Sequence, residues 1–216
     1  MNTTDAIWAL GRPTIGGVVR LLAPLRVYGA ERVPAEGGVV LALNHFSWLD
    51  PAAFGQASPR TIYYMAKAEA HAVPGLGQLI RAFGTFSVRR GESDREAVRM
   101  MRTIVREGKA LGLFAEGTRQ RSGVPGEVKP GAAMVALQED VPVVPAAIHG
   151  TQGWRLGSFR PVSVAWGEPM TFPDLPRNAK GYREASARVQ DAIRRQFDFL
   201  VDAHAVGRPK TALPPA

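Results

Sequence analysis

The segment Gly38-Val-Val-Leu-Ala-Leu-Asn-His-Phe-Ser-Trp-Leu-Asp50 is an apolar run that passes directly into a polar turn. A short, uninterrupted apolar run is typical of a buried strand. Four more runs outward from this segment have the same character, and helical patterns separate them. We therefore expect buried strands at Gly38–Leu43, Thr61–Ala66, Ala110–Ala115, Val143–Ile148 and Pro161–Trp166.

Three helices are predicted between and after these strands. Ser93 and Glu96 form a capping-box pattern, and Gly108 ends that helix. A second helix is expected over Pro130–Gln138 and a long one over Tyr182–Ala203. Strands that alternate with helices predict an α/β fold with a mixed, largely parallel sheet flanked by helices. In such folds the functional side chains lie at the carboxyl ends of the strands.

The composition fits one compact domain, which we place at residues 29–206. The chain has 216 residues, of which 45% are hydrophobic, and it contains no cysteine, which excludes disulfides and thiolate metal sites. Its net charge of +8 favours partners that carry phosphate, such as an anionic membrane, a phosphorylated ligand or nucleic acid. Nucleic-acid binding is not expected, because the aromatic residues fall mostly within apolar runs rather than among basic residues.

The two ends of the chain differ from this domain. The apolar stretch Ile7–Val27 is broken by arginines and prolines, so it does not predict a membrane span. We interpret residues 1–28 as an amphipathic segment at a membrane interface, and an ordinary helix docked on its own core is the alternative. Residues 207–216 are rich in proline and are predicted to be a disordered tail.

The turn after the first quoted strand contains His45 and Asp50. A carboxylate five residues after a histidine can accept its Nδ1–H, which leaves Nε2 as a base. The alternatives are that Asp50 caps a helix beginning at Pro51 and that His45 is merely buried. The chain has no G-x-S-x-G, Walker A or metal-ligand pattern, so no metal site is predicted. The remaining histidines are interpreted as surface or structural residues: His71, His149 and His204.

Three further blocks carry chemistry or rigidity. Arg89 and Arg90 stand beside a glycine, where two guanidinium groups could bind a phosphate monoester, or could simply be solvated. The strand ending at Ala115 leads into Glu116–Arg119, whose carboxylate could contact a substrate or stabilise the turn. The segment Val141–Pro145 could line an acyl groove or form a plain core strand.

Taken in order, the four blocks resemble the glycerolipid acyltransferase family, which includes the 1-acylglycerol-3-phosphate acyltransferases. The family pattern N-H-x-x-x-x-D is matched by Asn44, His45 and Asp50, and G-x-x-F-I-x-R by Gly84, Val88 and Arg90. F-P-E-G-T-R-S is matched by Phe114, Glu116, Gly117, Thr118 and Arg119, and V-P-I-V-P by Val141, Pro142, Val143, Val144 and Pro145. Ser87, Ala115 and Gln120 depart from these patterns, in the blocks that are expected to bind the acceptor.

The resemblance implies acyl transfer from acyl-CoA or acyl-ACP to the sn-2 hydroxyl of 1-acyl-sn-glycerol-3-phosphate, with no bound cofactor. It implies that His45 and Asp50 are catalytic, that Arg89, Arg90 and Glu116–Arg119 bind the acceptor phosphate, and that Val141–Pro145 bind the acyl chain or donor. It also implies an anionic membrane as partner and a peripheral or monotopic location on its cytoplasmic face. The rival hypotheses are another lysolipid or polar-lipid acceptor and a non-catalytic lipid-binding protein.

Overall fold

A computed structural model describes residues 11, 17, 21, 23–67, 71–75, 77–78, 81, 84–88, 94–155 and 157–216. In these ranges one seven-stranded sheet has the order β1-β7-β6-β2-β5-β3-β4, and every neighbouring pair is parallel except β6 with β7. The strands are β1 (Leu25–Tyr28), β2 (Val39–Leu43), β3 (Ile62–Lys67), β4 (Phe86–Val88), β5 (Ala110–Phe114), β6 (Val143–His149) and β7 (Val162–Trp166). The helices are η1 (Ala30–Arg32), α2 (Asp50–Ala57), α5 (Asp94–Arg106), α6 (Gly131–Glu139) and α7 (Ala179–Ala205).

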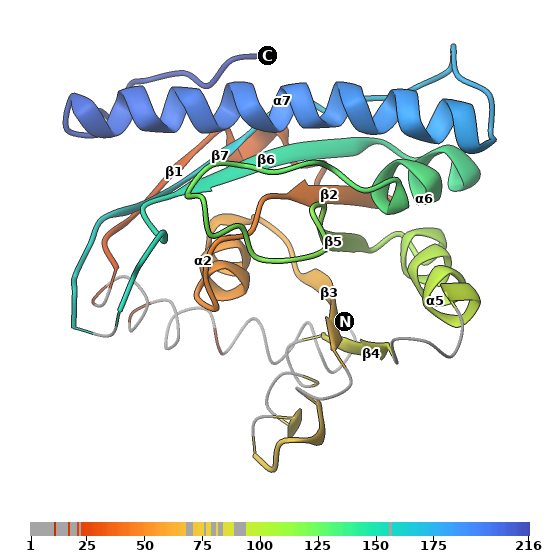
Figure 1. The fold of residues 1–216 in the computed structure, drawn as a ribbon, viewed down its shortest axis with the longest axis horizontal. Coiled ribbons are helices and arrows are strands. Elements are labelled where there is room, and N and C mark those ends of the chain that lie inside the picture. Colours follow the sequence, from red (N-terminus) through yellow and green to blue (C-terminus); the bar gives the residue numbers. More distant parts are fainter. Residues whose placement is uncertain are drawn as a thin grey trace.

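Helices cover both faces of the sheet, because the central strands are apolar on both sides. In β2 the side chains of Leu41 and Leu43 pack with Phe54 of α2 on one face. Val40 and Ala42 face the opposite way and pack with residues of α5, α6 and α7. Figure 1 shows the same arrangement, with the long α7 spanning the sheet on the side away from α2. The predicted α/β class and its five strands are therefore confirmed.

Two short edge strands were missed by the sequence analysis. β1 lies in the segment 1–28 that was predicted as a membrane-interface element, yet Leu25 to Tyr28 pair in parallel with Val162 to Ala165 of β7. β4 is three residues long and pairs with β3 at the other edge. Both strands are too short, and β1 too interrupted by charge, to show the continuous apolar run that marks the central strands.

The C-terminal residues differ from the predicted disordered tail. Arg32 donates hydrogen bonds from its guanidinium to the carbonyl oxygens of Pro214 at 2.9 Å and Pro215 at 2.7 Å. Gln196 of α7 also donates to the Pro215 carbonyl, at 2.9 Å. A proline-rich segment has free carbonyl acceptors and little backbone freedom, so a few donors from the domain suffice to hold it.

Candidate active site

The loop after β2 brings the predicted histidine and aspartate together. His45 Nδ1 lies 2.8 Å from Asp50 Oδ2, and the side chains are 17% and 0% exposed respectively. Because a carboxylate only accepts hydrogen bonds, Nδ1–H is the donor in this contact, and in the neutral imidazole Nε2 then keeps a free lone pair. The structure therefore holds an oriented imidazole whose ring retains access to solvent, which is the geometry of a general base.

Asp50 also fixes the loop that carries His45. Its Oδ2 accepts the backbone N–H groups of Phe46 at 2.6 Å and Ser47 at 2.8 Å, in addition to the imidazole. Asp50 is at the same time the first residue of α2, where a negative charge meets the positive end of the helix dipole. The predicted alternative of a helix-starting role therefore coexists with the pairing to His45, although Leu49 rather than Asp50 is the N-cap.

Asn44 ties the end of β2 to the neighbouring strand. Its side-chain amide donates to the Ile148 carbonyl at 3.2 Å and accepts from the Ile148 N–H at 2.8 Å. Both partners are fully buried. The backbone pairing of β2 with β6 ends at Leu43 and Ala146. The Asn44 side chain therefore links the two strands beyond their last paired residues, next to the position where His45 leaves the sheet.

Glu116 acts as a clamp on the backbone rather than as an exposed ligand. Its Oε2 accepts the His45 N–H at 2.8 Å and its Oε1 accepts the Gly126 N–H at 2.9 Å, while the residue is 2% exposed. Burial raises the pKa of Glu116 to about 7, against the lowering effect of the two backbone donors. Both carboxylate oxygens thus accept hydrogen bonds from the protein backbone. These bonds support a structural role for Glu116 rather than the predicted contact with the acceptor.

Aromatic rings support the imidazole from below. The His45 ring stacks on Phe114, with ring centroids 4.0 Å apart and planes at 22°. Tyr64 stacks in turn on Phe114, at 5.9 Å and 10°, and donates its hydroxyl to the Pro51 carbonyl at 3.1 Å. Phe114 was part of a recognised block, but nothing in the sequence alone indicated that it would lie against His45.

The remaining predicted site residues fall into three groups. Gly117, with φ of +72°, turns the chain after β5, and Thr118 and Arg119 are exposed beyond it. Arg89 and Arg90 lie outside the described residues. Within the segment Val141–Pro145, Val143 and Val144 are fully buried on opposite faces of the sheet. The core interpretation of that segment therefore fits its packing better than direct contact with an acyl chain.

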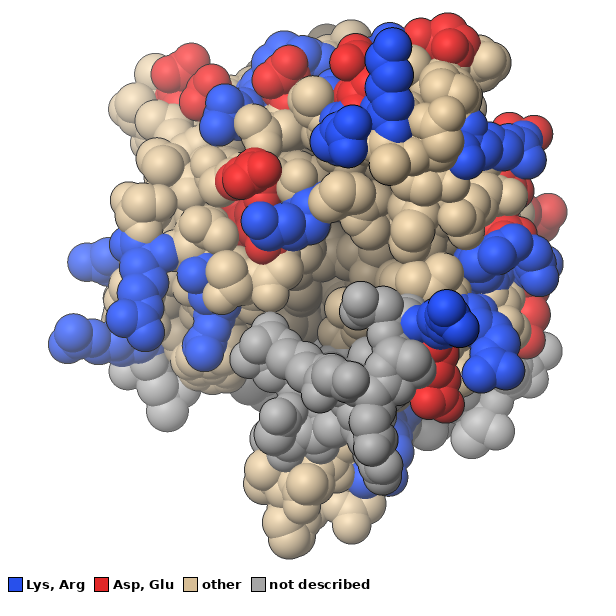
Figure 2. Space-filling view, turned by 45° about the vertical axis from the view of Figure 1, so that its right-hand side comes forward, with Lys and Arg blue, Asp and Glu red and all other residues tan. Residues whose placement is uncertain are grey.

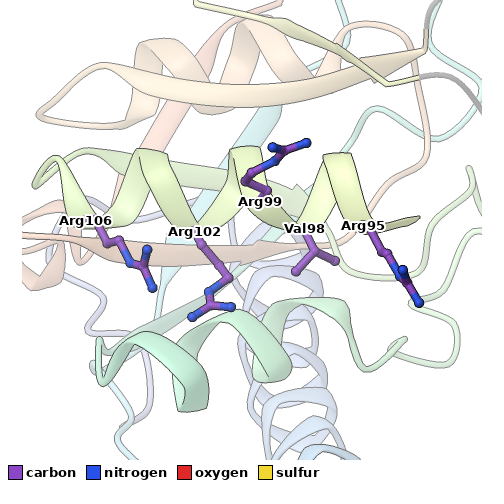
Figure 3. Close-up of a pocket in the computed structure, with 5 residues that line it drawn as sticks. All are labelled: Arg95, Val98, Arg99, Arg102 and Arg106. Atoms are coloured by element: carbon purple, nitrogen blue, oxygen red, sulfur yellow. The ribbon is translucent and has the colours of Figure 1, made fainter. Parts of the chain in front are cut away.

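A group of arginine side chains lies on α5, apart from His45. Figure 3 shows Arg95, Arg102 and Arg106 on one side of the helix and Arg99 directed the opposite way, beside a hollow of about 410 Å³. Glu139 of α6 pairs with both Arg102 and Arg106. Figure 2 shows how such basic side chains are spread over this side of the molecule, among fewer acidic ones. No residue of the His45 loop lines this hollow.

Two of the histidines interpreted as structural face each other at the carboxyl end of β6. The rings of His149 and His204 lie 4.5 Å apart, and His204 Nε2 is 2.9 Å from Ser163 Oγ. Burial, followed by the neighbouring His149, lowers the pKa of His204 to about 4, so the ring is neutral at pH 7. Both rings line an open hollow of about 490 Å³, which also includes Arg160. Within the described ranges, no three acidic or imidazole side chains are grouped as a metal site would require.

The α/β fold places the paired His45 and Asp50 at the carboxyl end of a parallel strand, where proteins of this fold class hold their functional side chains. The family model described as Acyltransferase matches residues 24–149, so the chain belongs to this family and is an O-acyltransferase. The matched region includes His45, Asp50 and Glu116.

Individual proteins agree with this membership. The chain is 31% identical over 188 residues to the 1-acyl-sn-glycerol-3-phosphate acyltransferase of Bacillus subtilis, covering 85% of this chain and 91% of that protein. It is 31% identical over 173 residues to the enzyme of the same name from Limnanthes douglasii, covering 74% of this chain and 60% of that protein. The crystal structure of the 1-acyl-sn-glycerophosphate (LPA) acyltransferase, PlsC, from Thermotoga maritima has the same fold, with a TM-score of 0.71 at 24% identity over 92% of this chain and 79% of that one.

Proposed function

We propose that this protein transfers a fatty acyl group from acyl-CoA or acyl-ACP to the sn-2 hydroxyl of 1-acyl-sn-glycerol-3-phosphate, giving phosphatidic acid. The observation that carries the proposal is the 2.8 Å contact between His45 Nδ1 and a fully buried Asp50. It is supported by the relative from Bacillus subtilis, which is named a 1-acyl-sn-glycerol-3-phosphate acyltransferase and aligns with 85% of the chain.

The reaction needs a base and no covalent intermediate on the protein. His45 Nε2 takes the proton of the acceptor hydroxyl as its oxygen attacks the thioester carbonyl carbon. The tetrahedral intermediate collapses and the carbon–sulfur bond breaks. The thiolate leaves and takes the proton from the imidazolium of His45, which returns to its neutral form. Asp50 stabilises the positive imidazole formed on the way, because it is buried and remains 2.8 Å from the ring. A base in this position typically contributes about 10²–10⁴ in rate.

The acceptor phosphate needs cations near the base. Arg119 is exposed, and its loop is bound to the His45 loop because the Gln120 N–H donates to the His45 carbonyl at 2.7 Å. Arg119 is therefore proposed to bind the phosphate, together with Arg89 and Arg90, while Gly117 and Thr118 shape the turn. Val141–Pro145 contribute through packing of the core, since Val143 and Val144 are fully buried and pair with Val40 and Leu41 of β2.

The proposed place of action is the cytoplasmic face of a membrane, with the protein bound peripherally or monotopically. The net charge of +8 favours an anionic lipid surface, and long acyl chains partition into a bilayer. Most of residues 1–28, the proposed interface segment, lie outside the described residues. Among the helices that the structure describes, none combines the length and apolar composition of a membrane span.

One assay tests the reaction directly. The chain contains no cysteine, so a thiol reagent reports release of CoA without background from the protein. Purified protein is incubated with acyl-CoA and lysophosphatidate, and the lipid product is identified by mass spectrometry. We expect phosphatidate with the wild type and a loss of about 10²-fold or more with His45→Ala. Near-normal transfer by a folded His45→Ala protein would disprove the mechanism.

The same assay, with other substrates, identifies which acyl donor and which acceptor the enzyme prefers. Acyl-CoA and acyl-ACP are compared at equal acyl-chain length, and lysophosphatidate is compared with other lysolipids and with glycerol-3-phosphate. The acceptor panel matters because Ala115 and Gln120 depart from the family pattern beside Glu116. A higher kcat/KM for another acceptor would replace lysophosphatidate while leaving the roles of His45 and Asp50 unchanged.

A further inference from the structure

Three loops at the catalytic edge of the sheet each present a large apolar side chain to solvent. Trp48 is 63% exposed, Val124 is 54% exposed and Phe159 is 56% exposed. They belong to residues 44–49, 115–130 and 150–161, which follow the parallel strands β2, β5 and β6 and so leave the sheet at one edge. Figure 1 shows these segments at the left-hand end of the sheet. Apolar side chains that share one face of a soluble protein indicate an interaction surface.

Contacts between the loops make this face, here called the loop surface, one preformed unit. The Gln120 N–H donates to the His45 carbonyl at 2.7 Å and joins the first two loops. Gln152 Nε2 donates to the Gly123 carbonyl at 3.1 Å and joins the second to the third. Trp48 packs edge-on against the buried Trp154, with ring centroids 5.4 Å apart, and joins the first to the third. The loops that carry the exposed apolar groups are therefore joined to one another.

The charged groups of the loop surface are mostly cations. Glu116 is buried, which leaves Glu127 as the exposed acid among the described residues of the three loops. The exposed arginines of these loops are Arg119, Arg121, Arg155 and Arg160. Apolar tips set among arginines match the interfacial region of an anionic bilayer, where acyl chains lie next to lipid phosphates.

Phe159 shows that the exposure is built into the backbone. Its φ is +47°, a left-handed conformation that is unfavourable for a bulky L-residue, and the Ser158 N–H closes a turn onto the Arg155 carbonyl at 3.0 Å just before it. The side chain of this residue is 56% exposed, so the strained conformation does not serve to bury it. Strained backbone conformations occur often at binding sites, so we interpret the exposed Phe159 side chain as a contact for a partner outside the chain.

We propose that the loop surface docks onto an anionic lipid bilayer. Trp48, Val124 and Phe159 enter the interface, and Arg121, Arg155 and Arg160 bind the phosphates of the surrounding lipids. Docking in this orientation turns the loop of His45 toward the membrane, so the acceptor reaches the base from the lipid. The inference rests on the proposed function for its substrate, a lysophospholipid, and adds the face of the protein that meets the membrane.

The first test places a reporter on the loop surface. Since the chain has no cysteine, a single introduced cysteine takes an environment-sensitive fluorophore at one site. The dye on Phe159→Cys is expected to shift to shorter wavelength with vesicles of phosphatidylcholine and phosphatidylglycerol. Leu213→Cys is the matched control, because Leu213 is 84% exposed on the C-terminal tail along α7 (Figure 1). Equal shifts at both sites, or a shift at Phe159→Cys only with acyl carrier protein or on self-association, would overturn the proposal.

The second test removes the contacts without straining the fold. Phe159→Asn suits the left-handed backbone, and we expect it to weaken vesicle binding about tenfold. Arg155→Gln and Arg160→Gln are expected to weaken it about fivefold each. Leu213→Asn should have no effect. Vesicle binding by Phe159→Asn and by the two arginine variants at wild-type strength would refute the docking.

Activity then separates docking from the proposed function. With a short-chain acyl-CoA and a short-chain lysophosphatidate, both monomeric in water, Phe159→Asn should match the wild type. With long-chain substrates in vesicles it should lose activity in parallel with binding. If the wild type transfers no acyl group in either format, the proposed function fails, and vesicle binding still decides the docking. If Phe159→Asn loses activity on the soluble substrates but binds vesicles normally, the loop surface serves the substrate and not the membrane.

Discussion

Replacing Asp50 by asparagine isolates the charge of the His–Asp pair from its geometry. All three hydrogen bonds of the Asp50 side chain converge on Oδ2, from His45 Nδ1, Phe46 N and Ser47 N. Its Oδ1 is buried without a partner among the described residues. In Asp50→Asn the side-chain oxygen can occupy the Oδ2 position and keep all three donors. The amide nitrogen then takes the unpaired Oδ1 position, so the loop keeps its shape while the negative charge is lost.

The expected effect is on rate. When His45 takes a proton, its positive charge lies about 4 Å from the carboxylate charge, an attraction of about 4 kcal/mol at an effective dielectric constant of about 20. Losing that attraction slows the step by about 10³-fold. The cost to folding is smaller, about 1–3 kcal/mol for one unpaired buried amide. Asp50→Ala, by contrast, strips three donors of their acceptor and should destabilise the fold by about 3–5 kcal/mol.

The assay measures kcat from thiol release, and thermal unfolding by circular dichroism reports stability in parallel. Asp198→Asn, on the exposed side of α7, serves as the control for loss of one negative charge. A folded Asp50→Asn protein with kcat within a few-fold of the wild type would refute the reasoning, because the charge would then contribute nothing to the imidazolium.

Three other variants test neighbouring parts of the site. Because burial raises the pKa of Glu116 to about 7 from 4.5, the folded state binds more protons than the unfolded state between these values, and stability falls as pH rises through that window. Glu116→Gln should remove this pH dependence of the free energy of unfolding, which is worth at most about 3 kcal/mol. Urea unfolding at several pH values measures it. Parallel curves for the wild type and the variant would contradict the raised pKa of Glu116. Arg119→Ala should raise the KM for lysophosphatidate about 10–100-fold with little change in kcat, as expected for one charge-assisted hydrogen bond, and an unchanged KM would remove Arg119 from the phosphate site. Asn44→Ala should lower the free energy of unfolding by about 2–4 kcal/mol, because it leaves the buried N–H and carbonyl of Ile148 unpaired, and a loss below about 0.5 kcal/mol would count against that role.

The site shows where local sequence was sufficient and where it was not. His45 and Asp50 are five residues apart, so a single turn can bring them together, and their pairing followed from spacing and chemistry. Glu116 is 71 residues from His45, and its bond to the His45 N–H exists because β2 and β5 pair in register, with Leu43 beside Phe114. The sequence offered Glu116 as a charged group after a strand, and only the pairing of the strands turned it into a clamp.

Burial decided the other differences. The apolar residues of Val141–Pro145 are compatible with an acyl groove or with a core strand. Val143 and Val144 belong to the two core clusters on opposite faces of the sheet, so the segment is part of the core. The tail was interpreted as disordered from its prolines, whereas Arg32 and Gln196, distant in sequence, supply its donors.

By itself the sequence determined the strand–helix alternation and the His–Asp pair, because each depends on residues within a few positions of one another. It also determined the basic charge, which is a sum over residue types. Only the tertiary structure decided that Glu116, Phe114 and Asn44 brace His45, and that the loops after three strands form one surface. These features depend on strand order and register, which arise from contacts between residues far apart along the chain.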